Sequence, residues 1–215
     1  MRVDSLLTAT YLAAALAVGL ISHEHAHARA ADGLGDASPR RWGWLTLNPS
    51  RKVDPFGTVI LPLLILVPWA AGVWFVPPFA YAKPMPFEPR SLRDPHRGPI
   101  WVAMAGPLAN LALAAAAGLA VRAGPGGQIG IAALALVYAN AVLCVFNLLP
   151  VPGLDGARLL ARALPPRARE TFTNLEHYLP LFLLLVYFLF AGPLLGVVQG
   201  LANVVCRALA GIDCV

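Results

Sequence analysis

Charged side chains are scarce in this sequence. Asp, Glu, Lys and Arg together make up 13% of the 215 residues, about half of the roughly 25% that is usual in soluble domains. Hydrophobic residues make up 58%, and the mean hydropathy is +0.67. No polar tract is long enough to fold as a separate soluble domain or recognition module. We therefore expect residues 1–215 to form a single transmembrane domain.

Cysteine is scarce too. The three cysteines are Cys144, Cys206 and Cys214, and their spacing matches neither a disulfide framework nor a zinc knuckle. The sequence therefore gives little reason to expect a disulfide, although it leaves a bridge between Cys206 and Cys214 open.

Acidic residues are outnumbered by basic ones, which gives a net charge of +5. The basic residues lie in short loops between apolar runs, as in the cytoplasmic loops of membrane proteins. This pattern favours the lipid bilayer as a partner and argues against nucleic acid.

Apolar runs dominate the rest of the chain. A membrane-spanning helix needs about 20 residues, so the sequence predicts an all-α polytopic membrane protein, a small helix bundle with spans at about 5–27, 99–121, 129–149 and 178–192. The run 57–80 contains four prolines, and we expect it to be kinked or re-entrant.

Residues 42–56 combine aromatic and β-branched residues with turn formers. This composition predicts a short β-hairpin or edge strand at the membrane edge. A strand over residues 44–47 could accept an unwound substrate by strand addition.

The first apolar run ends in HEHAH at residues 23–27. One interpretation is a secretory signal peptide with its cleavage site at residues 26–28. The other is a metal-binding helix, because His23 and His27 lie on one face and can bind one metal ion while Glu24 reaches a water molecule on it. His25 points about 200° away from His23 and is not expected to bind. Ionisable side chains are costly inside a membrane and mark function, which favours the second interpretation.

The segment NLLPVPGLDG at residues 147–156 offers a third metal ligand. Its two prolines and a glycine interrupt an apolar helix, which is tolerated only where the chain is buried in protein or lines a wet cavity. Asp155 follows this break and can complete a His-His-Asp zinc site with water in the fourth position. Taken by itself, Asp155 is also explained as a helix cap before a tight turn.

Three motifs together resemble the signatures of the site-2 protease family of intramembrane zinc metalloproteases. They are HEHAH at 23–27, AGPLAN at 105–110 and NLLPVPGLDG at 147–156, in the expected order. The resemblance runs from about residue 5 to residue 165, and the tail beyond about 170 carries no signature. The sequence contains no recognisable PDZ or CBS module, so it resembles the compact prokaryotic members.

The resemblance implies a role for each motif residue. It implies one Zn²⁺ per chain, bound by His23, His27 and Asp155. Glu24 would be the general base, and Asn147 would hold substrate backbone or the oxyanion near the cleft. Two further residues are interpreted separately. Asn110 is expected to be a buried interhelical hydrogen-bond donor, and Lys52 stands where we expect related sequences to have His, which argues against a metal-binding role at this position.

Lys and Arg residues predict the orientation in the membrane. Loops 28–56, 78–98 and 157–171 hold five, four and four of the sixteen. If 57–80 returns to the side from which it enters, these thirteen residues share one side, as the positive-inside rule requires for the cytoplasm. The metal site then faces the cytoplasm and the N-terminus lies outside.

The predicted function is that of an intramembrane zinc metalloendopeptidase in the cell membrane. It would hydrolyse peptide bonds of transmembrane protein substrates near the cytoplasmic side, with Glu24 acting on the metal-activated water. The main alternative is a membrane metal-binding or metal-transport protein that uses the same His/His/Asp site. A second alternative is a family member that has lost proteolysis. The sequence predicts neither the physiological substrate nor the oligomeric state.

Overall fold

The computed structural model describes residues 2–73, 77–83, 85–124, 126–178, 180–181 and 193–214. The longer helices are α1 (Arg2–Gly33), α4 (Gly98–Arg122), α5 (Gly127–Asn147) and α9 (Pro193–Ala210). The shorter helices are α2 (Ser38–Arg41), α3 (Leu61–Ala70), α6 (Asp155–Ala163) and α7 (Pro166–Asn174). Short 3₁₀ or π turns complete the set: η1 (Pro49–Arg51), η2 (Pro55–Ile60), η3 (Pro89–Ser91) and η4 (Leu175–Tyr178).

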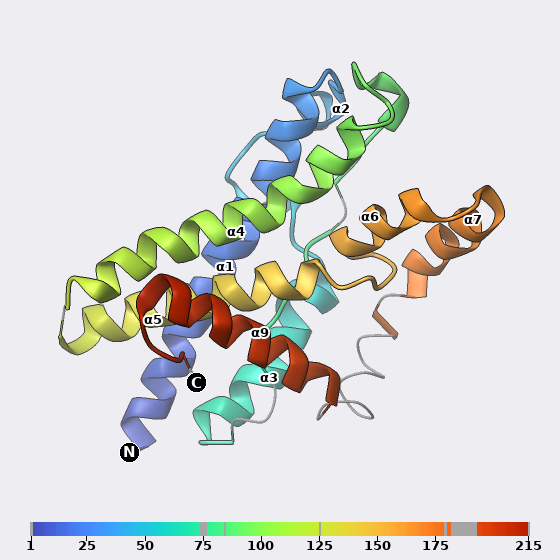
Figure 1. Ribbon diagram of the computed structural model, residues 1–215. Coiled ribbons are helices and arrows are strands. Elements are labelled where there is room, and N and C mark those ends of the chain that lie inside the picture. Colours follow the sequence, from blue (N-terminus) through green and yellow to red (C-terminus); the bar gives the residue numbers. More distant parts are fainter. Residues whose placement is uncertain are drawn as a thin grey trace.

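Among the described residues, three helices, α1, α4 and α5, are long and apolar enough to cross a membrane. They pack against one another, α9 lies across α5 and α4, and α6 and α7 extend away from the bundle (Figure 1). The prediction of an all-α, multi-pass membrane protein is therefore confirmed. These helices cover three of the predicted spans. The fourth, 178–192, falls almost entirely outside the described residues.

Helix α1 belongs to the core of this bundle. Leu12, Ala15 and Leu16 are at most 4% exposed and lie in the same apolar cluster as residues of α5 and α9. A cleavable leader would not supply core side chains, so the structure argues against the signal-peptide interpretation.

The three spanning helices alternate in direction. The Nδ1 atom of His27, late in α1, lies 2.6 Å from the carbonyl oxygen of Val102, early in α4, and Asn147 at the end of α5 lines a cavity with His23. Helices α1 and α5 therefore run in the same direction, and α4 runs opposite to them. The end of the bundle where His27, Val102 and Asn147 lie is called the site end below.

The segment between α2 and α4 begins and returns at the site end. After η2, α3 reaches the other end of α1, where Ser5 Oγ donates to the Ala70 carbonyl oxygen at 3.1 Å. Residues 77–83 run in extended form, and the Tyr81 amide donates to the Gly57 carbonyl oxygen at 3.1 Å. Residues 57 and 81 therefore lie side by side.

The expected β-hairpin over residues 42–56 is wrong, because the described part of the chain contains no strand. Local turns occupy this region instead. The Asn48 side chain accepts a hydrogen bond from the Ser50 amide and starts η1 at Pro49. Trp44 turns inward and packs against Ala28 and Val102, so its side chain serves helix packing and not a sheet.

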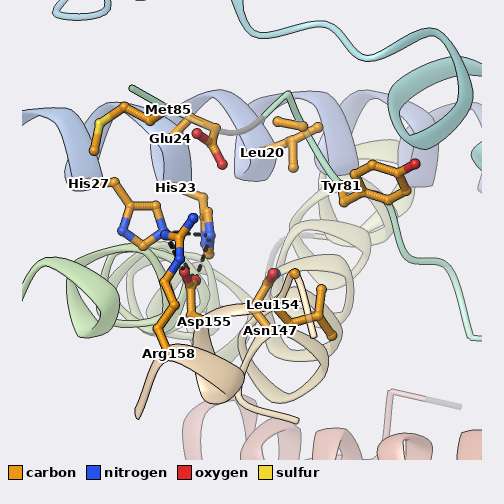
Figure 2. Close-up of a pocket in the computed structure, with 12 residues that line it drawn as sticks. Leu20, His23, Glu24, His27, Tyr81, Met85, Asn147, Leu154, Asp155 and Arg158 are labelled. Atoms are coloured by element: carbon orange, nitrogen blue, oxygen red, sulfur yellow. Dashed lines mark hydrogen bonds and ion pairs between the residues drawn. The ribbon is translucent and has the colours of Figure 1, made fainter. Parts of the chain in front are cut away.

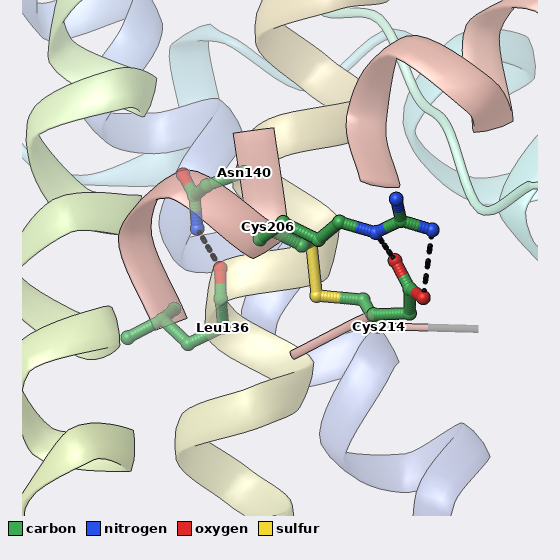
Figure 3. Close-up of a disulfide and its surroundings, with 6 residues drawn as sticks. Leu136, Asn140, Cys206 and Cys214 are labelled. Atoms are coloured by element: carbon green, nitrogen blue, oxygen red, sulfur yellow. Dashed lines mark hydrogen bonds and ion pairs between the residues drawn. A yellow bond between two sulfur atoms is a disulfide. The ribbon is translucent and has the colours of Figure 1, made fainter. Parts of the chain in front are cut away.

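The structure also corrects the expectation about cysteines, because Cys206 and Cys214 form a disulfide (Figure 3). Helix α9 ends at Ala210, and the turn that follows brings Cys214 back beside the buried Cys206. An ion pair between Arg207 and Asp213 flanks the bridge. Sequence spacing alone could not reveal this return. Cys144 is a buried free thiol.

Candidate metal centre

Two imidazoles and a carboxylate converge at the site end. His23 and His27 lie one turn apart on the same face of α1, with 3.0 Å between their Nε2 atoms. The Oδ2 atom of Asp155, the first residue of α6, lies 3.1 Å from each Nε2 (Figure 2). The three side chains are buried. The structure thus brings together the three residues that the sequence predicted as metal ligands.

The break after α5 explains the position of Asp155. Helix α5 ends at Asn147, and a run of turns leads to the start of α6. This reversal is tight enough that a Cβ atom on residue 156 would lie 2.1 Å from the Leu148 carbonyl oxygen. The sequence Asp155-Gly156 is therefore required as a pair, since glycine allows the close fold that aims the carboxylate at α1.

Both imidazoles are oriented by hydrogen bonds that they donate, His27 to the Val102 carbonyl oxygen and His23 to Asn110 Oδ1. The Nδ1 atom of His27 lies 2.6 Å from the Val102 carbonyl oxygen, which can only accept, so Nδ1 carries the proton. His23 Nδ1 lies 2.6 Å from Asn110 Oδ1. The Asn110 Nδ2 donates to the Asn140 Oδ1 at 2.9 Å and to the Gly19 carbonyl oxygen at 3.2 Å, which assigns its oxygen to His23. Both Nε2 atoms are then left without protons, as metal ligands must be.

The expectation for Asn110 is confirmed, because it is a buried donor between helices. The sequence did not reveal its second task, the orientation of His23. Asn140, which we expected to make an interhelical contact, is the residue on α5 that accepts from Asn110, and it donates to the Leu136 carbonyl oxygen at 2.9 Å. The only signal in the sequence was the presence of polar amides within apolar runs.

The chemistry of this cluster fits zinc. Two unprotonated nitrogens and a carboxylate oxygen within about 3 Å of one another repel unless they share a cation. Ligands at 2.0–2.1 Å from a tetrahedral zinc are about 3.3 Å apart, close to the spacing observed. Helix α4 leaves the imidazoles just enough room, since a Cβ atom on residue 106 would lie 2.4 Å from His27 Nε2. Gly106, in the AGPLAN motif, is thus a further residue of the centre.

Glu24 lies beside the cluster and faces the same cavity (Figure 2). The cavity measures about 30 Å³, enough for one or two water molecules. Within the described part of the chain, no hydrogen bond or ion pair to the Glu24 carboxylate is found, and the side chain is largely buried. A buried carboxylate that no described residue engages in a hydrogen bond or ion pair, next to a metal site, is available to exchange a proton with water.

Asn147 and Arg158 line the cavity opposite α1. The Asn147 Nδ2 donates to the Leu143 carbonyl oxygen at 2.8 Å, so this nitrogen is already engaged within α5. Arg158, one turn after Asp155, places Nη1 3.5 Å from Asp155 Oδ1. Sequence reasoning missed Arg158, although its spacing of three residues from Asp155 on a helix places it on the same face.

Lys52, which the sequence interpretation did not assign to the metal site, lies at the end of η1. It is 3% exposed, and its Nζ has no hydrogen-bond partner among the described residues. Burial lowers the pKa of Lys52, and the Glu24 carboxylate opposes this shift. Lys52 lines a separate apolar cavity with Leu20 and Ile21.

Curated proteins similar to this chain carry the words "zinc metalloprotease" in their names. The Bacillus subtilis protein named "Putative zinc metalloprotease YwhC" is 38% identical over 178 residues, which cover 78% of this chain and 75% of that protein. The Mycobacterium tuberculosis protein named "Putative zinc metalloprotease Rip2" is 33% identical over 175 residues, covering 79% of this chain and 63% of Rip2. A Rip2 from Mycolicibacterium smegmatis is 32% identical over 168 residues, which cover 75% of this chain and 60% of that protein.

No family model matches the chain, and no solved structure matches it. The similarity to the curated proteins is nevertheless extensive, and zinc is the metal that their names give and that the His23, His27 and Asp155 cluster fits. The chain belongs to the site-2 protease family of zinc metalloproteases.

Proposed function

We propose that this chain is an intramembrane zinc metalloendopeptidase that cleaves transmembrane proteins near the cytoplasmic side of the cell membrane. The observation that carries this proposal is the unpartnered Glu24 carboxylate beside the three candidate ligands, on a helix long and apolar enough to span a membrane. A metal store or transporter has no need for a free carboxylate one residue from its ligand.

The protein side chains divide the work of hydrolysis. When bound by His23, His27 and Asp155, zinc would supply Lewis acidity and lower the pKa of a water molecule to about 7. Glu24 takes the proton of the attacking water and delivers it to the leaving amine. Arg158 holds Asp155 Oδ1 and so leaves Oδ2 directed at the imidazoles.

An unwound substrate can pair with the extended segment 77–83. In extended chains, the backbone groups of alternate residues face opposite edges. The amides of Tyr81 and Lys83 donate to the carbonyl oxygens of Gly57 and Lys52, so the backbone groups of Ala82 between them face the other edge. Ala82 lines the metal cavity. We place strand addition here, with Asn147 Oδ1 accepting a hydrogen bond from a substrate amide.

Two independent features support a cytoplasmic active site and an outward N-terminus. The hydrogen bond between residues 57 and 81 supports a return of the chain to the side it left, and with such a return the basic loops share one side, as the positive-inside rule requires for the cytoplasm. The disulfide is the second supporting feature. Arg122, at the end of α4 away from the site end, donates to the carbonyl oxygens of Ala208 and Leu209 in α9. The end of α9 that carries the disulfide therefore lies away from the site end, and disulfides persist outside the cytoplasm.

Glu24→Gln tests the proteolytic function. The variant should bind one zinc per chain as the unmodified protein does, because its ligands are intact, but lose cleavage of a transmembrane reporter by roughly 100-fold or more. Zinc is measured by elemental analysis and cleavage by the size of the reporter. Glu170→Gln, on the exposed surface of α7, is the matched control and should cleave normally. Undiminished cleavage by Glu24→Gln would refute the proposal.

A further inference from the structure

A second cavity, called the tryptophan pocket here, lies outside the metal centre. It measures about 420 Å³, and its wall includes Trp42, Trp44, Ser50, Arg51 and Lys83. None of the described residues that line it is acidic. Residues from η1 and from the turn before it contribute most of the wall, and Lys83 and Pro86 contribute the rest.

The two cations of this pocket have no acidic partner in the described part of the chain. Arg51 is held in place, because its Nη1 donates to the Trp42 carbonyl oxygen at 3.1 Å. Its guanidinium packs over Gly43, at about 3.5 Å from the position of a Cβ atom there. Lys83 is fixed through its backbone amide, which donates to the Lys52 carbonyl oxygen at 2.9 Å. Two positive side chains in one hollow repel each other, and a bound anion removes that repulsion.

The position of the pocket matches the headgroup layer of a membrane. Trp44 packs against Ala28 and Ala31, beyond the metal ligands toward the end of α1. Trp42 is 62% exposed although it is large and apolar. Tryptophan is enriched where lipid headgroups meet the hydrocarbon layer, and anionic lipids of the cytoplasmic leaflet attract basic residues there.

We propose that the tryptophan pocket binds the phosphate group of an anionic phospholipid. Arg51 and Lys83 bind the phosphate oxygens, since a guanidinium matches two of them at once. The Ser50 hydroxyl is a further donor, and the exposed face of Trp42 packs against the lipid below its headgroup. A free phosphate would share the polar contacts but not the contact with Trp42.

Lipid bound here bears on catalysis, a consequence that rests on the proposed protease function. Lys83 directly follows Ala82, which lines the metal cavity. A phosphate held between Arg51 and Lys83 fixes the extended segment against η1 and so steadies the edge on which a substrate strand would pair. We expect cleavage to be faster in membranes that contain anionic lipid.

Binding is tested on the full chain in lipid nanodiscs, independently of proteolysis. Native mass spectrometry counts the lipid retained after release from nanodiscs of phosphatidylglycerol mixed with phosphatidylcholine. Glu24→Gln protein should retain phosphatidylglycerol as the unmodified protein does. The double variant Arg51→Gln, Lys83→Gln should lose about tenfold in affinity for it. The control Arg90→Gln, Arg93→Gln removes the same charge from exposed positions and should retain the lipid.

Three outcomes would overturn the assignment. These are equal retention by the pocket variant and the control, equal retention of phosphatidylcholine, and displacement of the lipid by inorganic phosphate, which would assign the pocket to a soluble anion. Unchanged zinc content and helical circular dichroism verify that the variants fold. If phosphatidylglycerol binds but no reporter is cleaved by any variant, the lipid site stands and the protease proposal fails.

Discussion

At the scale of single residues, the metal centre depends on how closely α4 approaches the imidazoles. Gly106→Ala places a methyl group 2.4 Å from His27 Nε2 and 2.6 Å from His23 Nε2, where the metal ligands must meet. We expect zinc affinity to fall by on the order of 100-fold, measured by competition with a chelator.

Gly196→Ala is the matched control for this change. Gly196 lies in α9 with no other atoms near the position of its Cβ, so the substitution should leave zinc affinity unchanged and stabilise the helix by about 1 kcal/mol. Full zinc affinity in Gly106→Ala would contradict the close approach of α4.

Lys52 gives a prediction about pH. Its pKa is lowered by burial, with Glu24 acting in the opposite sense, so below the pKa the folded protein holds a positive charge at a cost. Stability therefore rises with pH between the lowered pKa of the folded state and the pKa of about 10.4 in the unfolded chain.

Lys52→Met removes this cost. We expect the variant to be about 1 kcal/mol more stable at pH 7, and the advantage to shrink as the pH approaches 10. Thermal unfolding in detergent at several pH values measures both effects. An advantage that is the same at every pH would show that packing, and not charge, is responsible.

At the scale of elements, the sequence predicted what depends on periodicity and on motifs. The spacing of His23 and His27 places both on one face of any helix, and the proline-rich break before Asp155 required a buried or wet position. The predicted hairpin failed because aromatic residues such as Trp44 suit a helix interface as well as a strand. Pairing partners distant in sequence, such as Cys206 with Cys214 across a turn or Asn110 with Asn140, leave no periodic signal.

For the segment 57–80, the sequence predicted part of the structure. Its prolines indicated a break, and the count of basic residues indicated a return to the same side. The hydrogen bond between residues 81 and 57 agrees with the return, whereas Pro62 and Pro68 lie within α3 and do not end it. Residues 74–76 within it lie outside the described part of the chain.

At the scale of the whole molecule, the proposed orientation predicts which residues can be labelled from outside the cell. Ala123, beyond the end of α4, and Arg90, in the loop before α4, are both exposed but lie at opposite ends of the bundle. A membrane-impermeant maleimide should label Ala123→Cys in intact cells and Arg90→Cys only after permeabilisation. The natural cysteines interfere little, since Cys144 is buried and the other two are bridged. The reverse labelling pattern would place the metal site outside.

The chain of amides behind His23 determines which parts of the molecule can form an entrance. Asn110 joins α1, α4 and α5 through His23, Gly19 and Asn140, so none of these helices can slide past another without turning an imidazole away from its partner. The three helices therefore form one rigid unit. Under the proposed function, a transmembrane substrate would then have to reach the metal centre past the extended segment 77–83 or past α6, the two sides that these hydrogen bonds leave out.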